Sequence, residues 1–222
     1  MKSIILLAPP AAGKGTQSAL ISDKYDVPHI STGDLLRNAV RENHPSAGII
    51  KDLMNSGSIV TDEIVLELLK TRLDKSDCDN GYVLDGFPRN VSQAIAYENI
   101  LKNIGKELGI VIFLDLDKEI AKKRIVGRLS CSKCGNVYNS MFEETKPKID
   151  NLCDSCNTEL SRRDDDNEET FDKRFEVYIQ KTQPLIDYYE QKGILYRVNS
   201  GISKDYTFSK IEMIIRSSIW LI

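Results

Sequence analysis

The sequence lacks both a long apolar run and a marked excess of one charge. Its 222 residues carry 30 Lys and Arg against 33 Asp and Glu, which gives a net charge of −3. A helix that crosses a bilayer needs about 20 consecutive apolar residues, and no run approaches that length. Without a basic excess, the chain has no overall field that would draw it to nucleic acid or to a membrane surface. We therefore expect a globular protein that binds neither.

The N-terminal segment has too few apolar residues for a secretory signal. The apolar core of such a signal has roughly 7–15 residues, whereas Ile4 to Ala8 is followed directly by Pro9 and Pro10. The short run is instead typical of a buried parallel strand that ends in turn residues. We expect a cytoplasmic protein, in which cysteines are seldom joined as disulfides.

Apolar residues make up 41% of the chain, which is enough to form a core. Strand-like runs occur at 3–8, 27–30, 81–85, 110–114 and 194–198. Helical periodicity lies between them, at 34–42, 62–73, 91–103, 118–129, 168–190 and 205–219. This alternation predicts an α/β fold with a doubly wound parallel sheet of five strands and helices on both faces.

The first strand-like run leads into a loop of small residues, APPAAGKGTQ at 8–17. A strand, a small-residue loop and a helix that begins near Lys14 form a phosphate-binding arrangement, because loop amides and the helix N-terminus attract anions. Lys14 would neutralise phosphate charge, and Thr16 would lie near a phosphate-bound Mg²⁺. The strict pattern needs Gly at 8 and Ser or Thr at 15, where this chain has Ala8 and Gly15. Alone, the stretch also fits an ordinary strand-turn-helix start.

Two closely spaced cysteine pairs lie in a polar segment at 130–163, which we interpret as an inserted module. The pairs are Cys131 with Cys134 and Cys153 with Cys156, and this spacing predicts a closed, structural Zn²⁺ site of four thiolates. A zinc ribbon that binds nucleic acid is the alternative. The three lysines and four acidic residues between 131 and 156 do not favour it. Cys78 stands alone, and the sequence gives it no role.

Charged motifs follow the expected strands. They are STGDLLR at 31–37, DGFPR at 85–89, and Arg124 with Arg128, which a helix over 118–129 would place on one face. Ligands of doubly wound sheets lie beyond the carboxyl ends of the strands. The phosphate-binding loop, Arg37 and the turn at 85–89 would meet there. Together with Arg163 and Arg174, the arginines of these motifs would form a basic pocket in an acidic protein.

In chain order, APPAAGKGTQ, ISTGDLLR, SIVTDE, LDGFPRNVSQA, KKRIVGR and RRDDDNEET resemble the motifs of adenylate kinase. The four-cysteine module resembles the long lid of the bacterial zinc-containing form, and the resemblance covers nearly the whole chain. It implies a core at 1–30, 61–126 and 167–222, an AMP-binding arm at 31–60 and a lid with a zinc site at 127–166. It also implies a monomer that converts Mg·ATP and AMP reversibly into two ADP and so maintains adenine nucleotide balance.

The resemblance implies a role for each motif residue. The catalytic set would be Lys14, Arg89, Arg128, Arg163 and Arg174. ATP would contact Ala11, Ala12, Gly13, Lys14, Gly15, Thr16, Arg124, Arg128, Val137 and Tyr138, with Arg124 stacked on its adenine. AMP would contact Thr32, Arg37, Ser58, Ile59, Val60, Gly86, Arg89, Gln93, Arg163 and Arg174. Asp85 would hold Mg²⁺ through water, with Thr16 nearby. The metal ligands of Zn²⁺ would be Cys131, Cys134, Cys153 and Cys156. Asp165 and Asp166 would orient the lid arginines.

Two points stay open in the sequence. A UMP or CMP kinase of the same fold is the nearest alternative, although Thr32 and Gln93 favour adenine as the acceptor base. The family has Gly where this chain has Ala8 and Ala11, and if either has a positive φ, alanine costs about 1 kcal/mol there. We interpret His29 as a strand-end residue and His44 as a surface residue.

Overall fold

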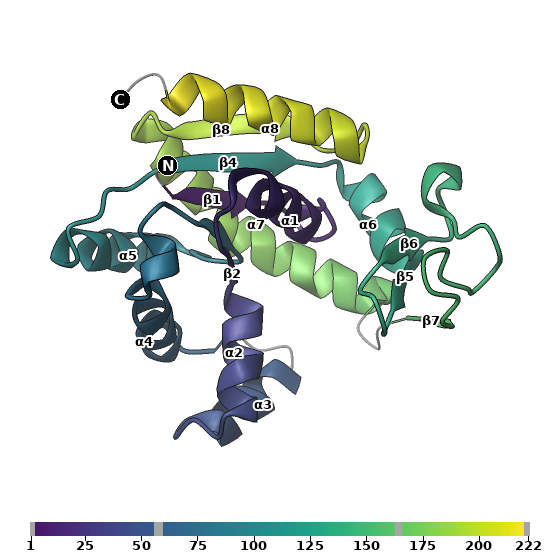
Figure 1. Cartoon of the computed structure of the whole chain (residues 1–222), viewed down its shortest axis with the longest axis horizontal. Helices are drawn as coiled ribbons and strands as arrows, with labels where there is room; N and C mark the ends of the chain where they lie inside the picture. Colours follow the sequence, from purple (N-terminus) through teal and green to yellow (C-terminus); the bar gives the residue numbers. More distant parts are fainter. Residues whose placement is uncertain (1–2, 56–59, 163–165, 220–222) are drawn as a thin grey trace.

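The computed structural model of the chain describes residues 3–55, 60–162 and 166–219. Its centre is a five-stranded parallel sheet with the strand order β2-β3-β1-β4-β8 (Figure 1). The strands are β1 (Ile4–Leu7), β2 (His29–Ser31), β3 (Val83–Asp85), β4 (Ile110–Asp115) and β8 (Leu195–Asn199). All four pairings are parallel, so the predicted sheet is confirmed.

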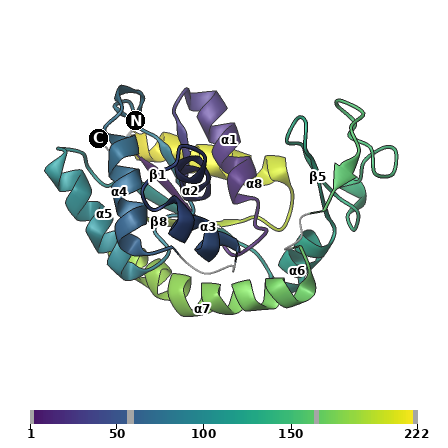
Figure 2. The same cartoon turned by 90° about the horizontal axis from the view of Figure 1, so that it is seen from below.

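The strands bury alternate residues against opposite layers of helices, because successive side chains of a strand point to opposite faces. Ile5 packs in a cluster with residues of α4 (Asp62–Leu73), α5 (Val91–Asn103) and α7 (Glu168–Gln191). Its neighbour Ile4 packs in a second cluster with residues of α1 (Lys14–Tyr25), α6 (Lys118–Val126) and α8 (Lys204–Ile219). In Figure 2, α7 lies on one side of the sheet and α1 with α8 on the other.

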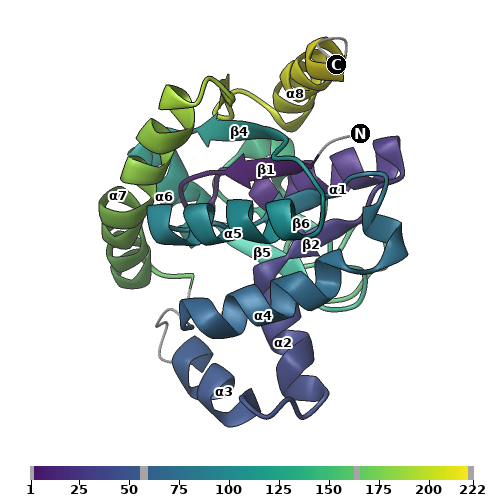
Figure 3. The same ribbon diagram turned by 90° about the vertical axis from the view of Figure 1, so that its left-hand side faces the viewer.

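Two smaller units project from this core at separate places. One contains α2 (Thr32–Arg41) and α3 (Ala47–Asn55), which lie with α4 at the end of the molecule away from α8 (Figure 3). The other is an antiparallel sheet of β5 (Arg128–Cys131), β6 (Val137–Asn139) and β7 (Leu160–Ser161), with the order β6-β5-β7. Figure 1 shows this sheet beyond the end of α6.

The structure corrects three details of the sequence prediction. The helix expected over 118–129 ends at Val126, Gly127 is its C-cap, and Arg128 begins β5. Arg124 and Arg128 therefore do not share a helix face, and that prediction was wrong. Helix α3 was not predicted, although Ile49, Ile50, Leu53 and Met54 recur at helical spacing. The three short lid strands were not predicted, because their sequences have neither a long apolar run nor a regular period.

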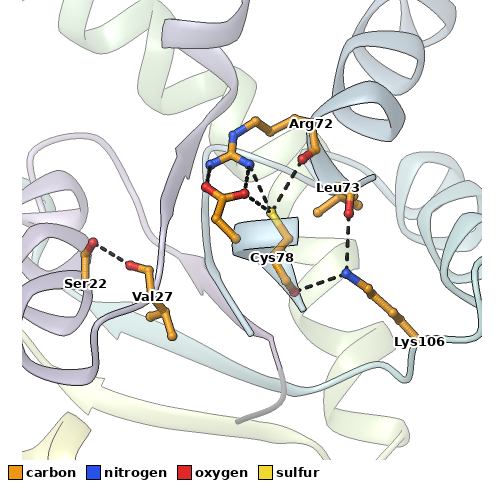
Figure 4. Close-up of polar contacts among 7 residues, drawn as sticks. Ser22, Val27, Arg72, Leu73, Cys78 and Lys106 are labelled. Atoms are coloured by element: carbon orange, nitrogen blue, oxygen red, sulfur yellow. Dashed lines mark hydrogen bonds and ion pairs between the residues drawn. The ribbon is translucent and has the colours of Figure 1, made fainter. Parts of the chain in front are cut away.

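Cys78 lies in a short 3₁₀ helix, η1 (Ser76–Cys78), that joins α4 to β3. Figure 4 shows the thiol beside the guanidinium of Arg72, whose Nη1 is 3.1 Å from Sγ. The Lys106 ammonium donates to the carbonyls of Leu73 and Cys78, at 3.3 and 3.1 Å, and so satisfies the end of α4. Burial raises the pKa of the Cys78 thiol. These contacts are structural, because they hold Cys78 against the C-terminal end of α4.

The figure also shows how α1 ends. Ser22 Oγ donates to the carbonyl of Val27 at 2.6 Å, across the left-handed residue Asp26 (Figure 4).

Among the described residues, no helix is both long and apolar enough to cross a membrane.

Candidate active site

The loop between β1 and α1 has the backbone of an anion-binding turn. Ala11 and Gly13 are left-handed, with φ of 63° and 81°, and α1 begins at Lys14 with no acidic residue in its first turn. The unpaired N–H groups of that turn and the helix dipole favour a bound anion. Ala8 is not among the residues with positive φ, so the strain expected of an alanine falls on Ala11 alone.

Asp85 ends β3 directly in front of this loop. Lys14 Nζ lies 3.3 Å from its Oδ1, and His29 Nε2 lies 3.3 Å from its Oδ2. Burial alone would raise the pKa of Asp85, but the hydrogen bond from His29 and the charge of Lys14 lower it below its usual value. A Cβ added to Gly15 would be 3.7 Å from Asp85 Oδ2, so the first turn of α1 lies against the carboxylate.

The Asp85 carboxylate suits a hard cation, because Mg²⁺ prefers oxygen ligands. Thr16 is exposed and lies in the same turn of α1 as Lys14. The two residues expected to serve Mg²⁺ thus lie on facing elements. His29 begins β2, as predicted for a strand-end residue, but its contact with Asp85 was not anticipated.

A small cavity of about 20 Å³ opens beside the β3 end of the sheet. Among the residues expected to contact AMP, its lining contains Thr32, Val60, Gly86, Arg89 and Gln93. Thr32 Oγ1 donates to the carbonyl of Gly86 at 3.1 Å, which joins the start of α2 to the end of β3. Arg89 Nε donates to the same carbonyl at 2.9 Å.

Arg37 does not line this cavity but points along α2. Its Nη2 is 2.6 Å from Asp34 Oδ1, one turn earlier in the helix. Burial alone would raise the pKa of Asp34, but the hydrogen bond and charge of Arg37 lower it. Ser58, Ile59, Arg163 and Asp165 lie outside the described residues, so their predicted roles stay predictions.

On the lid side, Arg128 forms a two-pronged ion pair with Asp166. Its Nε donates to Asp166 Oδ2 at 2.7 Å, its Nη2 contacts Oδ1, and the Asp166 side chain is fully buried. This is the orienting contact expected of Asp166. Arg124 Nη2 donates to the carbonyl of Ser200 at 3.0 Å, which ties α6 to the loop after β8. Desolvation lowers the pKa of Arg89, and the charge of Arg174, on α7, lowers it further, whereas the charge of Asp85 raises it.

The two predicted lid contacts to ATP differ in exposure. The Val137 side chain is 55% exposed, whereas Tyr138 is buried in the small apolar cluster of the lid. The Tyr138 hydroxyl accepts from the backbone N–H of Asp154 at 2.9 Å. The Tyr138 ring therefore packs under the cysteine pairs, and its contact to ATP stays a prediction.

The four paired cysteines come together in the lid. All four Sγ atoms lie within 4.8 Å of one another, and the nearest pairs, Cys131 with Cys156 and Cys134 with Cys153, are 3.4 Å apart. Zn–S bonds of about 2.3 Å in a tetrahedron place sulfurs about 3.8 Å apart. The donor set and its spacing therefore fit Zn²⁺.

Both cysteine pairs sit on the same kind of turn. The N–H of Gly135 donates to the carbonyl of Cys131 at 3.0 Å, and the N–H of Asn157 donates to that of Cys153 at 2.8 Å. Gly135 and Asn157 both have a positive φ, of 76° and 52°. The left-handed residue after each pair lets the chain fold back so that both sulfurs face one point.

Three residues that form hydrogen bonds at the site were not identified from the sequence. Asp62 accepts a hydrogen bond from Gln93, Asn139 Nδ2 donates to the carbonyl of Arg124, and Arg162 Nη1 donates to that of Val126. The last two satisfy the C-terminal end of α6 from the lid. The motif SIVTDE contains Asp62 and the motif RRDDDNEET contains Arg162, and these were the available signals.

Comparison with known proteins agrees with this arrangement. The family model described as adenylate kinase matches residues 6–194. An adenylate kinase of Clostridium botulinum, strain Loch Maree, is 46% identical over 212 residues, 96% of this chain and 97% of the relative. Those of Archaeoglobus fulgidus and Thermotoga neapolitana are 45% and 43% identical over 213 and 216 residues, with at least 96% of this chain and 97% of each relative covered. The chain belongs to the adenylate kinase family.

Proposed function

We propose that the protein transfers a phosphoryl group reversibly between Mg·ATP and AMP, to give two molecules of ADP. Membership of the family makes it a nucleoside monophosphate kinase, a phosphotransferase. The observation that supports the reaction best is the contact of Lys14 with Asp85, beside a cavity lined by Thr32 and Gln93. The relatives' name, adenylate kinase, favours AMP over UMP or CMP as the acceptor.

The donor side would be held by the loop and the first turn of α1. The amides of Ala11 to Thr16 and the Lys14 ammonium would bind the ATP phosphates, as in other phosphate-binding loops. Asp85, with Thr16 nearby, would hold Mg²⁺ through water, and that ion would neutralise charge on the phosphates. Arg124 would stack on the ATP adenine, with Val137 and Tyr138 of the lid beside it.

The acceptor side would be held by the arm and the β3–α5 loop. Arg37 and Arg89 would bind the AMP phosphate, which requires Arg37 to exchange Asp34 for that phosphate. Thr32, Val60, Gly86 and Gln93 would enclose the base and ribose, with Ser58 and Ile59 nearby. No general base is needed, because the attacking phosphate oxygen is already an anion.

Transfer itself would depend on positioned positive charge and on exclusion of water. Phosphoryl transfer needs in-line geometry and charge stabilisation but little covalent work by the protein. Lys14, Arg89, Arg128, Arg163 and Arg174 would surround the moving group. The lid would close over the phosphates and keep water out, since water would otherwise hydrolyse ATP.

The four cysteines would bind a structural Zn²⁺. A set of four thiolates leaves no open coordination position, so the metal would stabilise the lid without taking part in the reaction.

The expected monomeric state and cytoplasmic location stay predictions.

The test uses ADP and Mg²⁺ as the only substrates. We expect ATP and AMP to appear in equal amounts by chromatography, and Lys14→Ala to lower turnover by at least 100-fold, because the charge on the moving phosphoryl is lost. The variant should keep its circular dichroism spectrum. A folded wild-type protein that leaves ADP unchanged would contradict the proposal, and CMP and UMP with ATP would then be tested as acceptors.

A further inference from the structure

Asp62, the first residue of α4, contacts the amide side chain of Gln93, which lines the cavity. Its Oδ1 accepts from Gln93 Nε2 at 2.6 Å, and its Oδ2 lies 3.3 Å from Ser92 Oγ. Asp62 and Gln93 are 31 residues apart in the chain, so the contact joins two helices, α4 and α5. The phosphoryl transfer proposed above does not require Asp62.

The other end of the Gln93 amide is also fixed. Its Oε1 accepts from the backbone N–H of Arg89 at 2.7 Å, and the residue is 1% exposed. A backbone N–H can only donate, and an ionised carboxylate can only accept. Only one of the two amide orientations satisfies both neighbours, because the flipped one would set two donors against each other at Arg89 and two acceptors at Asp62.

Because its orientation is fixed, the Gln93 amide presents one pattern of hydrogen-bond donor and acceptor to a base. After these two bonds, Gln93 has one N–H and one oxygen lone pair left. Adenine carries a donor amine next to a ring nitrogen that accepts, which matches an amide oxygen and N–H in that order. Hypoxanthine carries an accepting oxygen next to a donating ring N–H, and it needs the flipped amide.

We propose that Asp62 is a specificity-determining positioning residue, which holds the Gln93 amide in the orientation that accepts a 6-amino purine and rejects a 6-oxo purine. Asp62 itself is held by its place in the first turn of α4. The Ser92 hydroxyl lies 3.3 Å from Asp62 Oδ2, but its one proton has a nearer acceptor in Asn90 Oδ1 at 2.7 Å. The inference rests on the proposed placement of the AMP base at Gln93.

The experiment compares AMP with IMP as acceptors in steady-state assays of wild type and Asp62→Asn. An asparagine can donate or accept at this position, so one of the two constraints on the amide is removed. We expect the ratio of kcat/KM for AMP to that for IMP to fall about 10-fold, as one hydrogen-bond preference implies. The KM for AMP should rise, while kcat at saturating AMP and the KM for ATP stay within about twofold.

The matched control is Glu63→Gln, which removes the same charge from the next residue of the same helical turn. Glu63 is exposed and outside the proposed site, and its variant should keep the wild-type ratio. If Asp62→Asn does not fold, Asp62→Ser serves instead, since a hydroxyl also donates and accepts. A folded variant that loses activity toward AMP and IMP in equal proportion would overturn the inference.

The variant Gln93→Leu tests separately whether the AMP base lies at Gln93, on which the proposed role of Asp62 depends. If the base lies at Gln93, the leucine variant loses the preference for AMP over IMP. Loss of the preference in Gln93→Leu but not in Asp62→Asn would overturn only the role of Asp62. An unchanged preference in Gln93→Leu would overturn the placement of the base as well.

Discussion

Ala11 has a left-handed backbone conformation in the phosphate-binding loop, with φ of 63°. This conformation costs an alanine roughly 1–2 kcal/mol, whereas glycine adopts it freely. Glycine also gains entropy in the unfolded chain, which offsets part of the difference. We therefore predict that Ala11→Gly raises the free energy of unfolding by about 0.5–1 kcal/mol, measured by denaturant titration.

Ala8→Gly is the control for this prediction. Ala8 is the first residue of the same loop but is not among the residues with positive φ, so glycine there adds unfolded-state entropy without relieving strain. This variant should be less stable than wild type by about 0.5–1 kcal/mol. If Ala11→Gly is destabilised to the same extent, the loop does not hold residue 11 in a left-handed conformation in solution.

Single residues also define the limit of what the sequence alone predicts about the site. Lys14 and Asp85 were expected to act together, and they lie 3.3 Å apart, because motifs at the carboxyl ends of parallel strands must meet. Asp62 could not be paired with Gln93 in this way. Their contact depends on how α4 packs on α5, which no local pattern encodes.

At the scale of elements, the core strands were predictable and the lid strands were not. The strand β4 is a continuous apolar run buried between two helix layers, as a central parallel strand must be. The strand β7 has two residues, and β5 and β6 are short and partly polar. Because the lid is arranged around four cysteines, its strands carry little of the apolar alternation on which a strand prediction depends.

The helix α6 was predicted too long because its sequence keeps a helical pattern past Gly127. A Cβ at Gly127 would meet Asn139 Oδ1 at 2.2 Å and Met141 Cγ at 2.9 Å. Asn139 cannot move freely, since its Nδ2 donates to the Arg124 carbonyl at 2.9 Å and its Oδ1 accepts from the Met141 N–H at 2.9 Å. The close approach of β6 to the end of α6 thus requires glycine.

We predict that Gly127→Ala lowers the free energy of unfolding by about 1–3 kcal/mol, the usual cost of forcing an extra methyl group into a packed site. Denaturant titration measures the change. Gly48→Ala is the matched control, because it lies in α3 with no atom within 4 Å of an added Cβ. That variant should be as stable as wild type or more stable, because alanine is the better helix former. Equal stability of both variants would contradict the packing argument.

At the scale of the whole molecule, the lid has a separate and much smaller apolar cluster. It consists of Leu129, Cys131, Tyr138, Cys153 and Leu160, with Cys156 against it. Among the described residues from 127 to 162, none belongs to either of the two large clusters of the core. The lid therefore has little hydrophobic stabilisation of its own against the entropy of ordering its chain, and we expect its order to depend on a metal at the cysteine site.

We predict that Cys131→Ser abolishes zinc binding and unfolds the lid alone. Binding of a structural zinc supplies roughly 10 kcal/mol or more of folding free energy in small modules, more than this cluster can replace. Hydrogen exchange should lose protection in 128–161, while β1 and β4 keep theirs because their packing lies in the core clusters. Cys78→Ser is the control, since Cys78 is buried beside α4 and should leave zinc content and lid protection unchanged. Lid protection that persists in a zinc-free Cys131→Ser protein would show that the thiolate cluster does not hold the lid together.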